Sequence, residues 1–494
     1  MKYIYTNKEA KAIDRHAIET VGISGLVLME KAAMSVAAIF SAGEKKESRV
    51  LAVCGTGNNG GDGIAVARIL HEMGYRSAIT VVGETERMTQ ETAKQLEIAV
   101  ACQVPVLSLS SIREEDFDVI IDGIFGIGLT RNVEGVYEKV IDDINASGAS
   151  IYALDIPSGI HGTTGAVMNT AVRADLTVTF GVNKLGLILY PACEYAGEVF
   201  VTDIGFPQCS VQSVDSSVYH YEKTDLPALL PQRPARSHKG SFGKVLVVAG
   251  SEKMSGACYL AAKAAYCAGA GLVRVVSTAD NRGILLSSLP EILFSTRDEL
   301  AEGVDWADVV IIGPGIDLTQ EAEEMVRYVV ENAPVPVVID GDGIRHLRKC
   351  TDCLTDNFVL TPHVKEMSYL TGMDIAELQR DIVGTTVDSA RQWGCIIVQK
   401  DARTVVSDGV ESCINVCGNS GMATGGSGDV LAGVIGGLLA QGMDSFAAAK
   451  LGVYLHGLAG DEMLSVTGTY GMMASDLITG LQKVFARQEN GEFV

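Results

Sequence analysis

The sequence predicts an α/β protein of two domains, each built on a parallel sheet that helices cover. Its 494 residues suffice for two or three domains of about 100–200 residues each. Short continuous apolar runs alternate with helix-like segments, which is typical of strands buried on both faces. Four of the 12 prolines, Pro207, Pro227, Pro231 and Pro234, fall in one polar segment that interrupts this alternation.

The first half begins with a predicted helix. Thr6 and Glu9 have the spacing of a capping box, and we expect the helix to run to about Val21. Further along, the pattern predicts helices at 26–40, 62–73 and 91–100, and strands at 49–54, 77–82, 118–122 and 150–155.

The second half resumes the same alternation after the proline-rich segment. We expect the first domain to span residues 1–215 and the second residues 225–490. The predicted elements of the second domain are a helix at 255–268, strands at 244–249, 272–277, 308–312, 335–340, 358–361 and 395–399, and three helices from residue 428 onward.

The charge of the chain limits its partners. A net charge of -22 argues against sequence-blind binding to nucleic acid and against binding to an acidic membrane surface. Small anionic substrates stay possible, because a few backbone N–H groups can hold a phosphate. The N-terminus has no signal-peptide pattern, and the apolar stretch 430–440 is too short to span a bilayer. We therefore expect a cytoplasmic protein with small-molecule substrates, no nucleic acid and no membrane.

The 11 cysteines are scattered along the chain. Cys350 and Cys353 form one CxxC pair, with His346 four residues before it. A structural zinc site needs a second ligand pair at suitable spacing, which is missing. Reduced thiols are therefore the preferred interpretation, and a redox or metal role is the alternative.

A glycine-rich segment follows the predicted strand at 49–54. Gly55, Gly57 and Gly60 have the G-x-G-x-x-G spacing, which lets a backbone approach a ligand at a helix N-terminus. A tight strand-to-helix turn gives the same pattern. Asn58 and Asn59 add amide oxygens, which suit a hard cation or ribose hydroxyls.

Two carboxylates lie where other strands of this half end. Asp122 and Asp155 each follow an apolar run, and ligands of open α/β sheets bind at this edge. Each Asp alone could be a turn or helix cap. An ordinary dehydrogenase is also compatible with such a loop, with Glu84 holding a ribose, but no site for a second, oxidisable substrate is visible.

Three segments, Asn58–Gly63 (NNGGDG), Asp122–Gly128 (DGIFGIG) and Asp155–Gly159 (DIPSG), resemble the NAD(P)H-hydrate epimerase domain. That domain is Rossmann-like, with three layers, and forms the N-terminal part of bifunctional nicotinamide nucleotide repair enzymes. The resemblance covers residues from about 10 to 210. It implies that the dinucleotide is the substrate and not a hydride carrier.

The resemblance also implies ligands for this site. It implies a K+ ion at Asn59, Asp122 and Ser158, and it makes Asp155 the group that contacts the hydrated ring. Because inversion of the hydroxylated carbon needs reversible proton transfer, Asp155 is our hypothesis for the catalytic acid–base group. The implied substrate-binding residues are Asn58, Asn59, Gly60, Gly61, Asp62, Gly126, Ile127, Gly128, Leu129, Thr130, Arg131, Asn132, Tyr137 and Asp155.

The second half carries a longer glycine-rich segment before an apolar helix. Gly425, Gly426 and Gly428 leave backbone N–H groups free to form an anion-binding nest, and the helix dipole adds to it. Asp429 can take a proton from a hydroxyl that attacks phosphorus, as phosphoryl transfer requires. The alternative is an Asp that only caps the helix.

Other residues support this site. Lys400 ends a predicted strand, where it could contact phosphate or be a solvated surface charge. His363 and Glu366 open a helix after a strand, but a lone HxxE is more often structural. Gly313 and Gly315 permit close backbone approach after another strand.

Together, HKGSFGKVLVVAGS, GPG, TPHVKE and GNSGMATGGSGDVLAG resemble the ADP/ATP-dependent NAD(P)H-hydrate dehydratases, which have a ribokinase-like fold. The resemblance runs from about residue 225 to 488, with Ser420 where many relatives have Pro. It implies that Mg2+ and ADP or ATP take part, and that Asp429 is catalytic. It places the hydrated nicotinamide near Ala257, Gly315, His363 and Asp429, and the adenine nucleotide near Lys400, Asp401, Ala402, Arg403, Thr404 and Gly428.

The leading hypothesis is a fused enzyme that also forms a homo-oligomer. Its first domain interconverts the R and S hydrates, and its second dehydrates the S form through a phosphorylated intermediate. One alternative is a kinase of a vitamin-type alcohol with a non-catalytic N-terminal domain, because fold alone does not fix the substrate. Another is an N-terminal interaction scaffold, against which intact Asn59, Asp122 and Asp155 argue.

Overall fold

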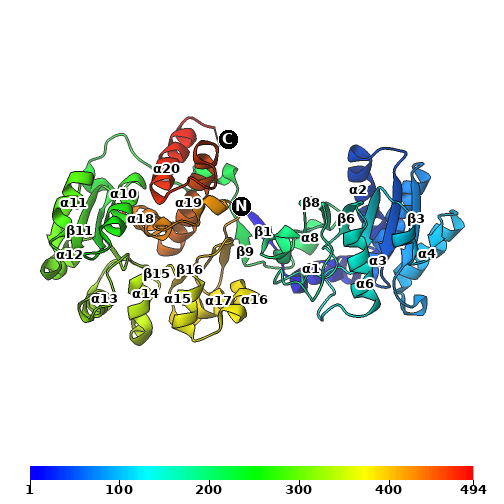
Figure 1. Cartoon of the computed structure of the whole chain (residues 1–494), viewed down its shortest axis with the longest axis horizontal. Helices are drawn as coiled ribbons and strands as arrows, with labels where there is room; N and C mark the ends of the chain where they lie inside the picture. Colours follow the sequence, from blue (N-terminus) through cyan, green and yellow to red (C-terminus); the bar gives the residue numbers. More distant parts are fainter. Residues whose placement is uncertain (493–494) are drawn as a thin grey trace. The chain divides into compact units, whose positions relative to one another are not determined.

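The computed structural model describes residues 1–492, apart from the side chain of Lys349. The chain divides into two compact units (Figure 1). The first is Tyr3–Ser216, and the second holds Met1, Lys2 and the chain from Ser217 onward. Each unit contains a mostly or wholly parallel sheet with helices packed on it, which confirms the predicted fold class.

The N-terminal unit contains a seven-stranded sheet in the order β4-β3-β2-β5-β6-β7-β8, with every pair parallel. Its strands are β2 (Arg49–Cys54), β3 (Arg76–Val81), β4 (Val106–Leu107), β5 (Val119–Gly123), β6 (Ser150–Leu154), β7 (Leu176–Phe180) and β8 (Glu198–Thr202). Its helices are α1 (Asn7–Arg15), α2 (Gly25–Gly43), α3 (Asn58–Glu72), α4 (Gln90–Ala101), α5 (Ser111–Glu114), α6 (Val136–Ala146), α7 (Leu185–Ile188) and α8 (Gln208–Val211).

The start of this unit agrees with the sequence prediction, with one correction. The capping box of Thr6 and Glu9 is present, and a π-helical turn at His16–Val21 continues α1 to the expected end. The prediction that the third helix begins at Asp62 is wrong, because α3 begins at Asn58 with Gly57 as its N-cap. The asparagines therefore belong to the first helical turn and not to the preceding loop.

Both faces of the N-terminal sheet are buried. Val50 and Ala52 of β2 join one core cluster, and Leu51 and Val53 join the other, because successive side chains of a strand point to opposite faces. Among residues 1–492, α2 is the one helix long and apolar enough to cross a membrane. Its side chains, including Phe40, pack in the core cluster that contains Val50.

The C-terminal unit contains an 11-stranded sheet in the order β1-β9-β18-β17-β16-β15-β14-β13-β10-β11-β12. The strands from β16 to β12 are parallel, whereas β17 is antiparallel to both its neighbours. The strands are β1 (Lys2–Ile4), β9 (Val218–His220), β10 (Lys244–Val248), β11 (Leu272–Ser277), β12 (Leu293–Thr296), β13 (Val309–Ile312), β14 (Val337–Ile339), β15 (Phe358–Leu360), β16 (Ile396–Gln399), β17 (Val405–Ser407) and β18 (Ser412–Ile414).

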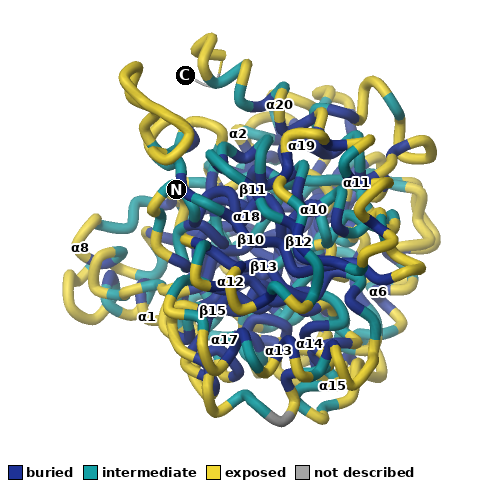
Figure 2. The backbone as a smooth tube through the Cα atoms, turned by 90° about the vertical axis from the view of Figure 1, so that its left-hand side faces the viewer, coloured by how far each residue is buried: buried dark blue, intermediate teal, exposed yellow. Residues whose placement is uncertain are grey.

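Helices cover both faces of this sheet, and the three helices predicted for the end of the chain are present as α18, α19 and α20. In the burial view, the tube is mostly dark blue along β10, β11 and β13 (Figure 2). The helices are α9 (Leu226–Leu229), α10 (Ser255–Cys267), α11 (Asn281–Ser288), α12 (Leu300–Trp306), α13 (Gln320–Asn332), α14 (Asp342–His346), α15 (Val364–Thr371), α16 (Ile375–Arg380), α17 (Ile382–Trp393), α18 (Ser427–Ala440), α19 (Ser445–Thr467) and α20 (Ala474–Glu489).

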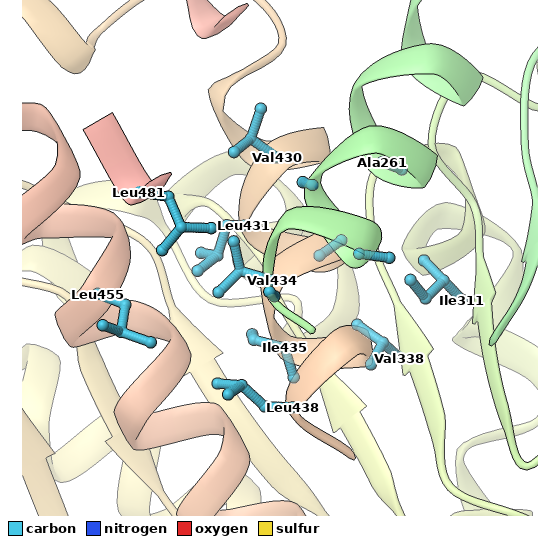
Figure 3. Close-up of a cluster of buried hydrophobic side chains, with 14 of the residues drawn as sticks. Ala261, Ile311, Val338, Val430, Leu431, Val434, Ile435, Leu438, Leu455 and Leu481 are labelled. Atoms are coloured by element: carbon cyan, nitrogen blue, oxygen red, sulfur yellow. The ribbon is translucent and has the colours of Figure 1, made fainter. Parts of the chain in front are cut away.

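From Val430 to Leu439, helix α18 is apolar and buried on all sides. Its side chains lie between the sheet residues Ile311 and Val338 and the helices α19 and α20 (Figure 3). It also packs closely against α10, since a Cβ on Gly433 would be 2.3 Å from the Ala261 carbonyl oxygen. This close packing fixes the position of the N-terminus of α18 relative to the sheet.

In each unit the strand order reverses at one point. The chain runs from β2 outward to β4 and returns to β5 on the other side of β2. In the second unit it runs from β10 to β12 and returns to β13 beside β10. Ligands of open α/β sheets bind outside the carboxyl ends of the strands at such reversals. The fold therefore predicts two separate ligand sites, one in each unit.

Candidate active sites

The N-terminal unit has a cavity of about 600 Å3 at its strand reversal, where β2 and β5 end. Most of the residues implied for the epimerase site line it: Asn58, Asn59, Asp62, Gly126, Ile127, Gly128, Leu129, Thr130, Arg131, Tyr137 and Asp155. Three implied residues are not among its lining residues. Gly60 and Gly61 are buried, with other protein atoms filling the space beside them, and Asn132 is exposed.

Asp155 forms a buried ion pair in this cavity. Its Oδ1 lies 2.6 Å from Nζ of Lys184, which also donates to the Phe180 carbonyl oxygen at 2.7 Å. The Thr179 hydroxyl donates to the same carboxylate oxygen at 3.3 Å. Asp155 has a φ of +64°, which is uncommon outside glycine. The backbone thus accepts an unfavourable conformation that directs this carboxylate at Lys184.

Three further carboxylates line the same cavity, and one of them, Glu91, comes from α4. Asp14 comes from α1 and Asp62 from α3. Burial raises the pKa of Asp62 well above its usual range, with Asp155 and Asp14 adding to the shift and Lys184 opposing it. Burial also raises the pKa of Asp14, followed by repulsion from Asp155. Asp14, Asp62 and Asp155 therefore all interact with the ammonium group of Lys184.

The residues implied for the cation meet beside this cavity. Asp122 accepts the Ser158 N–H at 2.7 Å on one oxygen and the Ser158 hydroxyl at 2.6 Å on the other. Nδ2 of Asn59 donates to the Phe125 carbonyl oxygen at 3.0 Å. Burial raises the pKa of Asp122 to about 6, although its hydrogen bonds from Ser158 and Ile124 lower it.

Within residues 1–492, no Lys, Arg or His forms a salt bridge with Asp122. A buried carboxylate without a counter-charge is costly, so a bound monovalent cation fits this place. The oxygen ligands offered there suit a hard cation as well.

In the C-terminal unit, Asp429 lies in the first turn of α18. The N-cap is Gly426, with a φ of +94° and no side-chain hydrogen bond to the helix start. Asp429 is thus not the helix cap. Burial raises its pKa to about 7, and the carboxylates of Asp340 and Asp342 add to the shift while Lys400 opposes it. A carboxylate with such a pKa suits a base that works near neutrality.

Lys400 is not a solvated surface charge. Its Nζ lies 2.6 Å from Oδ1 of Asp340, and only 20% of its side chain is exposed. Asp340 also accepts the Thr361 hydroxyl at 2.6 Å. Burial acts to lower the pKa of Lys400, but Asp340 and then Glu366 raise it, and the net shift is upward.

His363 and Glu366 form the capping box of α15. Nδ1 of His363 accepts the backbone N–H groups of Lys365 and Glu366, both at 3.1 Å. The backbone N–H of His363 donates to the Glu366 carboxylate at 2.9 Å. With Nδ1 as an acceptor, the neutral ring carries its proton on Nε2. Burial raises the pKa of Glu366 to about 7. The HxxE pair therefore has a structural role and also places two titratable groups beside Lys400.

The remaining implied dehydratase residues come from two helix starts and two loops, with Ala257 in the first turn of α10 and Gly428 in that of α18. Gly315 has a φ of +60°, and a Cβ on it would be 3.0 Å from that of Ala257. A Cβ on Gly428 would be 3.2 Å from Nζ of Lys400. The residues 401–404 form the turn between β16 and β17 directly after Lys400.

The glycine-rich segment before α18 is anchored from α19. Oδ2 of Asp461 accepts the Gly418 N–H at 3.0 Å, and its Oδ1 accepts from Nδ2 of Asn419 at 3.2 Å. The Ser427 hydroxyl donates to the Met422 carbonyl oxygen at 2.7 Å. These bonds hold both ends of the segment in place.

Several of these residues were missed by the sequence analysis: Asp14, Lys184, Asp340, Asp342 and Asp461. A signal was available for two of them, because Asp340-Gly341-Asp342 follows a predicted strand just as Asp122-Gly123 does. Among residues 1–492, no group of three or more His, Cys, Asp or Glu is arranged to hold a metal ion. Cys350 and Cys353 are free thiols.

Family models match both halves of the chain. Residues 245–483 match the family described as NAD(P)H-hydrate dehydratase, and residues 25–186 match the family described as YjeF-related protein N-terminus. Among solved structures, a ribokinase-like superfamily protein from Enterococcus faecalis is 29% identical, with a TM-score of 0.51 over 56% of this chain and 97% of that protein. The ADP/ATP-dependent NAD(P)H-hydrate dehydratase from Bacillus subtilis, co-crystallised with ATP/Mg2+, is 28% identical, with a TM-score of 0.50 over 55% and 99%.

Similar proteins extend over the whole chain. The bifunctional NAD(P)H-hydrate repair enzyme Nnr of Thermofilum pendens is 36% identical over 98% of this chain and 97% of that protein. The enzyme of the same name from Escherichia coli is 33% identical over 95% and 92%. With both halves matched and both candidate sites present, this chain belongs to the family of bifunctional NAD(P)H-hydrate repair enzymes.

Proposed function

We propose that this protein repairs hydrated NADH and NADPH in two steps. Residues 1–215 interconvert the R and S hydrates, and residues 225–490 dehydrate the S form at the expense of ADP or ATP. The observation that carries this proposal is that each unit has its own acid–base site at the carboxyl ends of its parallel strands. Asp155 with Lys184 forms the first, and Asp429 beside Lys400 and Asp340 forms the second.

In the first unit, the cavity of about 600 Å3 binds the hydrated dinucleotide. Asp155 takes a proton from the hydroxylated ring or returns one to it. Lys184 holds the Asp155 carboxylate in one orientation, since the pair is buried and its geometry is fixed by a further bond to Phe180. Lys184 is therefore a positioning residue for Asp155.

We assign the cation site of this unit to K+, held by Asn59, Asp122 and Ser158. The support is the buried carboxylate of Asp122, which has no counter-charge among the described residues. When bound, K+ neutralises Asp122 through oxygen ligands. Ser158 and Phe125 belong to loops beside the cavity, so this neutralisation steadies the cavity wall.

In the second unit, Asp429 takes the proton from the ring hydroxyl as that oxygen attacks the terminal phosphorus of the nucleotide. The α18 N-terminus and Lys400 stabilise the charge that develops on the transferred group. Elimination of phosphate is easier than elimination of hydroxide, and the electron pair of the ring nitrogen assists it. The products are NAD(P)H, phosphate and the shortened nucleotide.

We assign Mg2+ to the second site together with the nucleotide phosphates, because Mg2+ is usually held by one or two carboxylates and by substrate phosphates. In addition to burial, the carboxylates of Asp340 and Asp342 raise the pKa of both Asp429 and Glu366, so these four acids lie in one region of the unit. When bound, Mg2+ neutralises phosphate charge. The residues proposed to hold the nucleotide are Lys400, Asp401, Ala402, Arg403, Thr404 and Gly428, and those proposed for the hydrated ring are Ala257, Gly315, His363 and Asp429.

The kinase alternative is not favoured. Relatives matched over nearly the whole chain are bifunctional repair enzymes, and the N-terminal cavity has its own acid–base groups. A scaffold has no need of a buried Asp155–Lys184 pair inside a cavity. We place the reactions in the cytoplasm, on small-molecule substrates, and expect the chain to act as a homo-oligomer without nucleic acid.

The deciding experiment incubates the protein with a mixture of hydrated NADH epimers, with and without ADP or ATP. NADH absorbance should recover fully only when a nucleotide is present, and both epimers should be consumed. An Asp155→Ala variant should consume only the S form at the enzymatic rate. If neither nucleotide restores NADH, or if Asp155→Ala epimerises at the wild-type rate, the corresponding assignment fails.

A further inference from the structure

The carboxylate of Asp62 differs from that of Asp155 although both line one cavity. Asp155 is held by Lys184 and by two weaker bonds, from Thr179 and from the Phe180 N–H. Within residues 1–492, Asp62 accepts no hydrogen bond and forms no salt bridge. A carboxyl group in a ligand cavity without a protein partner is free to contact the ligand.

The groups around Asp62 come from four elements. Asp155 follows β6, Asp14 is on α1, Lys184 precedes α7, and Cys54 ends β2. Burial and the two neighbouring carboxylates raise the pKa of Asp62 well above its usual range, and Lys184 opposes them only in part. Like charges crowded in a poorly solvated place cannot all be ionised, so one acid keeps its proton.

We infer that Asp62 is a second catalytic residue of the epimerase, a proton donor to the ring hydroxyl that works together with Asp155 as proton acceptor. This inference rests on the proposed function of the N-terminal unit. It goes beyond substrate contact, which is all that the family resemblance implied for Asp62.

The proposed step balances in protons and electrons. Asp62 gives its proton to the hydroxyl, the carbon–oxygen bond breaks, and its electron pair leaves with water. The ring nitrogen supplies the electron pair that stabilises the carbon. Water then adds to the other face of the ring, and its surplus proton passes to Asp155. The return of one proton from Asp155 to Asp62 through water in the cavity restores the starting state, so no cofactor is consumed.

The test measures epimerisation in the full chain without nucleotide, so that dehydration cannot drain the S form. Asp62→Asn keeps the size and the hydrogen-bonding ability but carries no acidic proton. We expect its kcat to fall at least about 100-fold with KM within about threefold, whereas Asp62→Glu should recover part of the rate. Glu86→Gln removes one carboxylate from an exposed position of the same unit and serves as the control.

The pH profile separates catalysis from a structural role. In the wild type, kcat should fall as pH rises through the pKa of Asp62, because only the protonated form donates. Asp14→Asn removes a neighbouring negative charge, which lowers the pKa of Asp62 and moves this limb to lower pH. The residual activity of Asp62→Asn should lack the limb, and its N-terminal unit should melt as in the wild type.

The source of the oxygen tests the bond that breaks. In water enriched in 18O, each epimerisation should place a solvent oxygen in the product hydroxyl. Retention of the original oxygen, or an Asp62→Asn variant with wild-type kcat, overturns the inference while leaving the epimerase itself intact. A wild-type chain that does not equilibrate the epimers overturns the proposed function instead.

Discussion

Nζ of Lys400 lies 2.6 Å from Oδ1 of Asp340, and this pair lies beside Gly428, in the first turn of the helix that carries Asp429. Lys400 directly follows β16 and Asp340 directly follows β14, so the pair joins the carboxyl ends of two strands. The ammonium group is thereby fixed before any phosphate arrives. Positioning of this kind lowers the cost of stabilising charge in a transition state.

Loss of Lys400 should affect stability and catalysis in separable ways. Lys400→Met leaves Asp340 as an unpaired buried carboxylate and should destabilise the C-terminal unit by about 3 kcal/mol. Adding Asp340→Asn should restore most of this loss without restoring dehydration. Denaturant unfolding and steady-state kinetics of both variants check this. Equal activity in Lys400→Met and wild type would remove Lys400 from the site.

Asp429→Asn should abolish dehydration and leave epimerisation intact. The amide cannot accept the hydroxyl proton, so kcat with ADP or ATP should fall about 100- to 10,000-fold. Each reaction is followed separately, dehydration by NADH absorbance and epimerisation by chromatography of the two hydrates. Parallel loss of both activities would indicate misfolding or one shared site.

Dehydration should have an acidic limb near pH 7. Burial raises the pKa of Asp429 to about 7, so the base is protonated below that pH and ionised above it. Activity should therefore rise with pH up to about 8, with Glu366, whose pKa is also about 7, contributing to the same limb. A profile of kcat against pH with saturating nucleotide measures it. A flat profile between pH 5.5 and 8 contradicts the assignment of Asp429 as base.

K+ should stabilise the N-terminal unit through Asp122. The cation neutralises a buried carboxylate, so replacing Na+ by K+ at fixed ionic strength should raise the Tm of that unit in the wild type. The matched variant Asp122→Asn has no charge to neutralise and should lose this K+ dependence. Calorimetry of both proteins checks the difference. If the Tm of both proteins responds equally to K+, Asp122 is not the ligand through which K+ stabilises the unit.

Asp461 should control nucleotide binding without touching the nucleotide. Asp461→Ala removes the acceptor for the Gly418 N–H, which loosens the glycine-rich segment and should raise the KM for ADP or ATP about 10-fold. Asp461→Asn retains an amide oxygen for the same bond and should recover most of the affinity. The kcat should change less than the KM in both variants. A change in kcat alone argues against a positioning role.

Much of the fold follows from local sequence patterns. The strand at Arg49–Cys54 and the capping box at Thr6 were predicted correctly because an apolar run and a cap are local features. Three strands of the first sheet were not predicted, and one of them, Val106–Leu107, has only two residues. The other two are Leu176–Phe180 and Glu198–Thr202. Their alternating polar residues dilute the apolar signal, and pairing with a neighbouring strand stabilises them.

The candidate sites divide in the same way. Glycine turns at strand ends, such as the one at Gly55, can be seen in sequence because glycine has a local backbone role. The start of α3 at Asn58 was misjudged because glycines normally argue against a helix interior, whereas close packing of Gly60 against Gly55 favours them here. Glu84, considered for a ribose contact, is exposed and pairs with Arg87.

The sequence by itself determined the two-domain α/β class, the strand ends that carry Asp122 and Asp155, the glycine-rich helix start that carries Asp429, and the family. Only the tertiary structure decided which charges meet: Lys184 with Asp155, and Lys400 with Asp340. Secondary structure depends on neighbours within a few positions, and the sequence contains those directly. Ion pairs and shifted pKa values depend on burial and on groups brought together from distant elements, which exist only once the sheet is assembled.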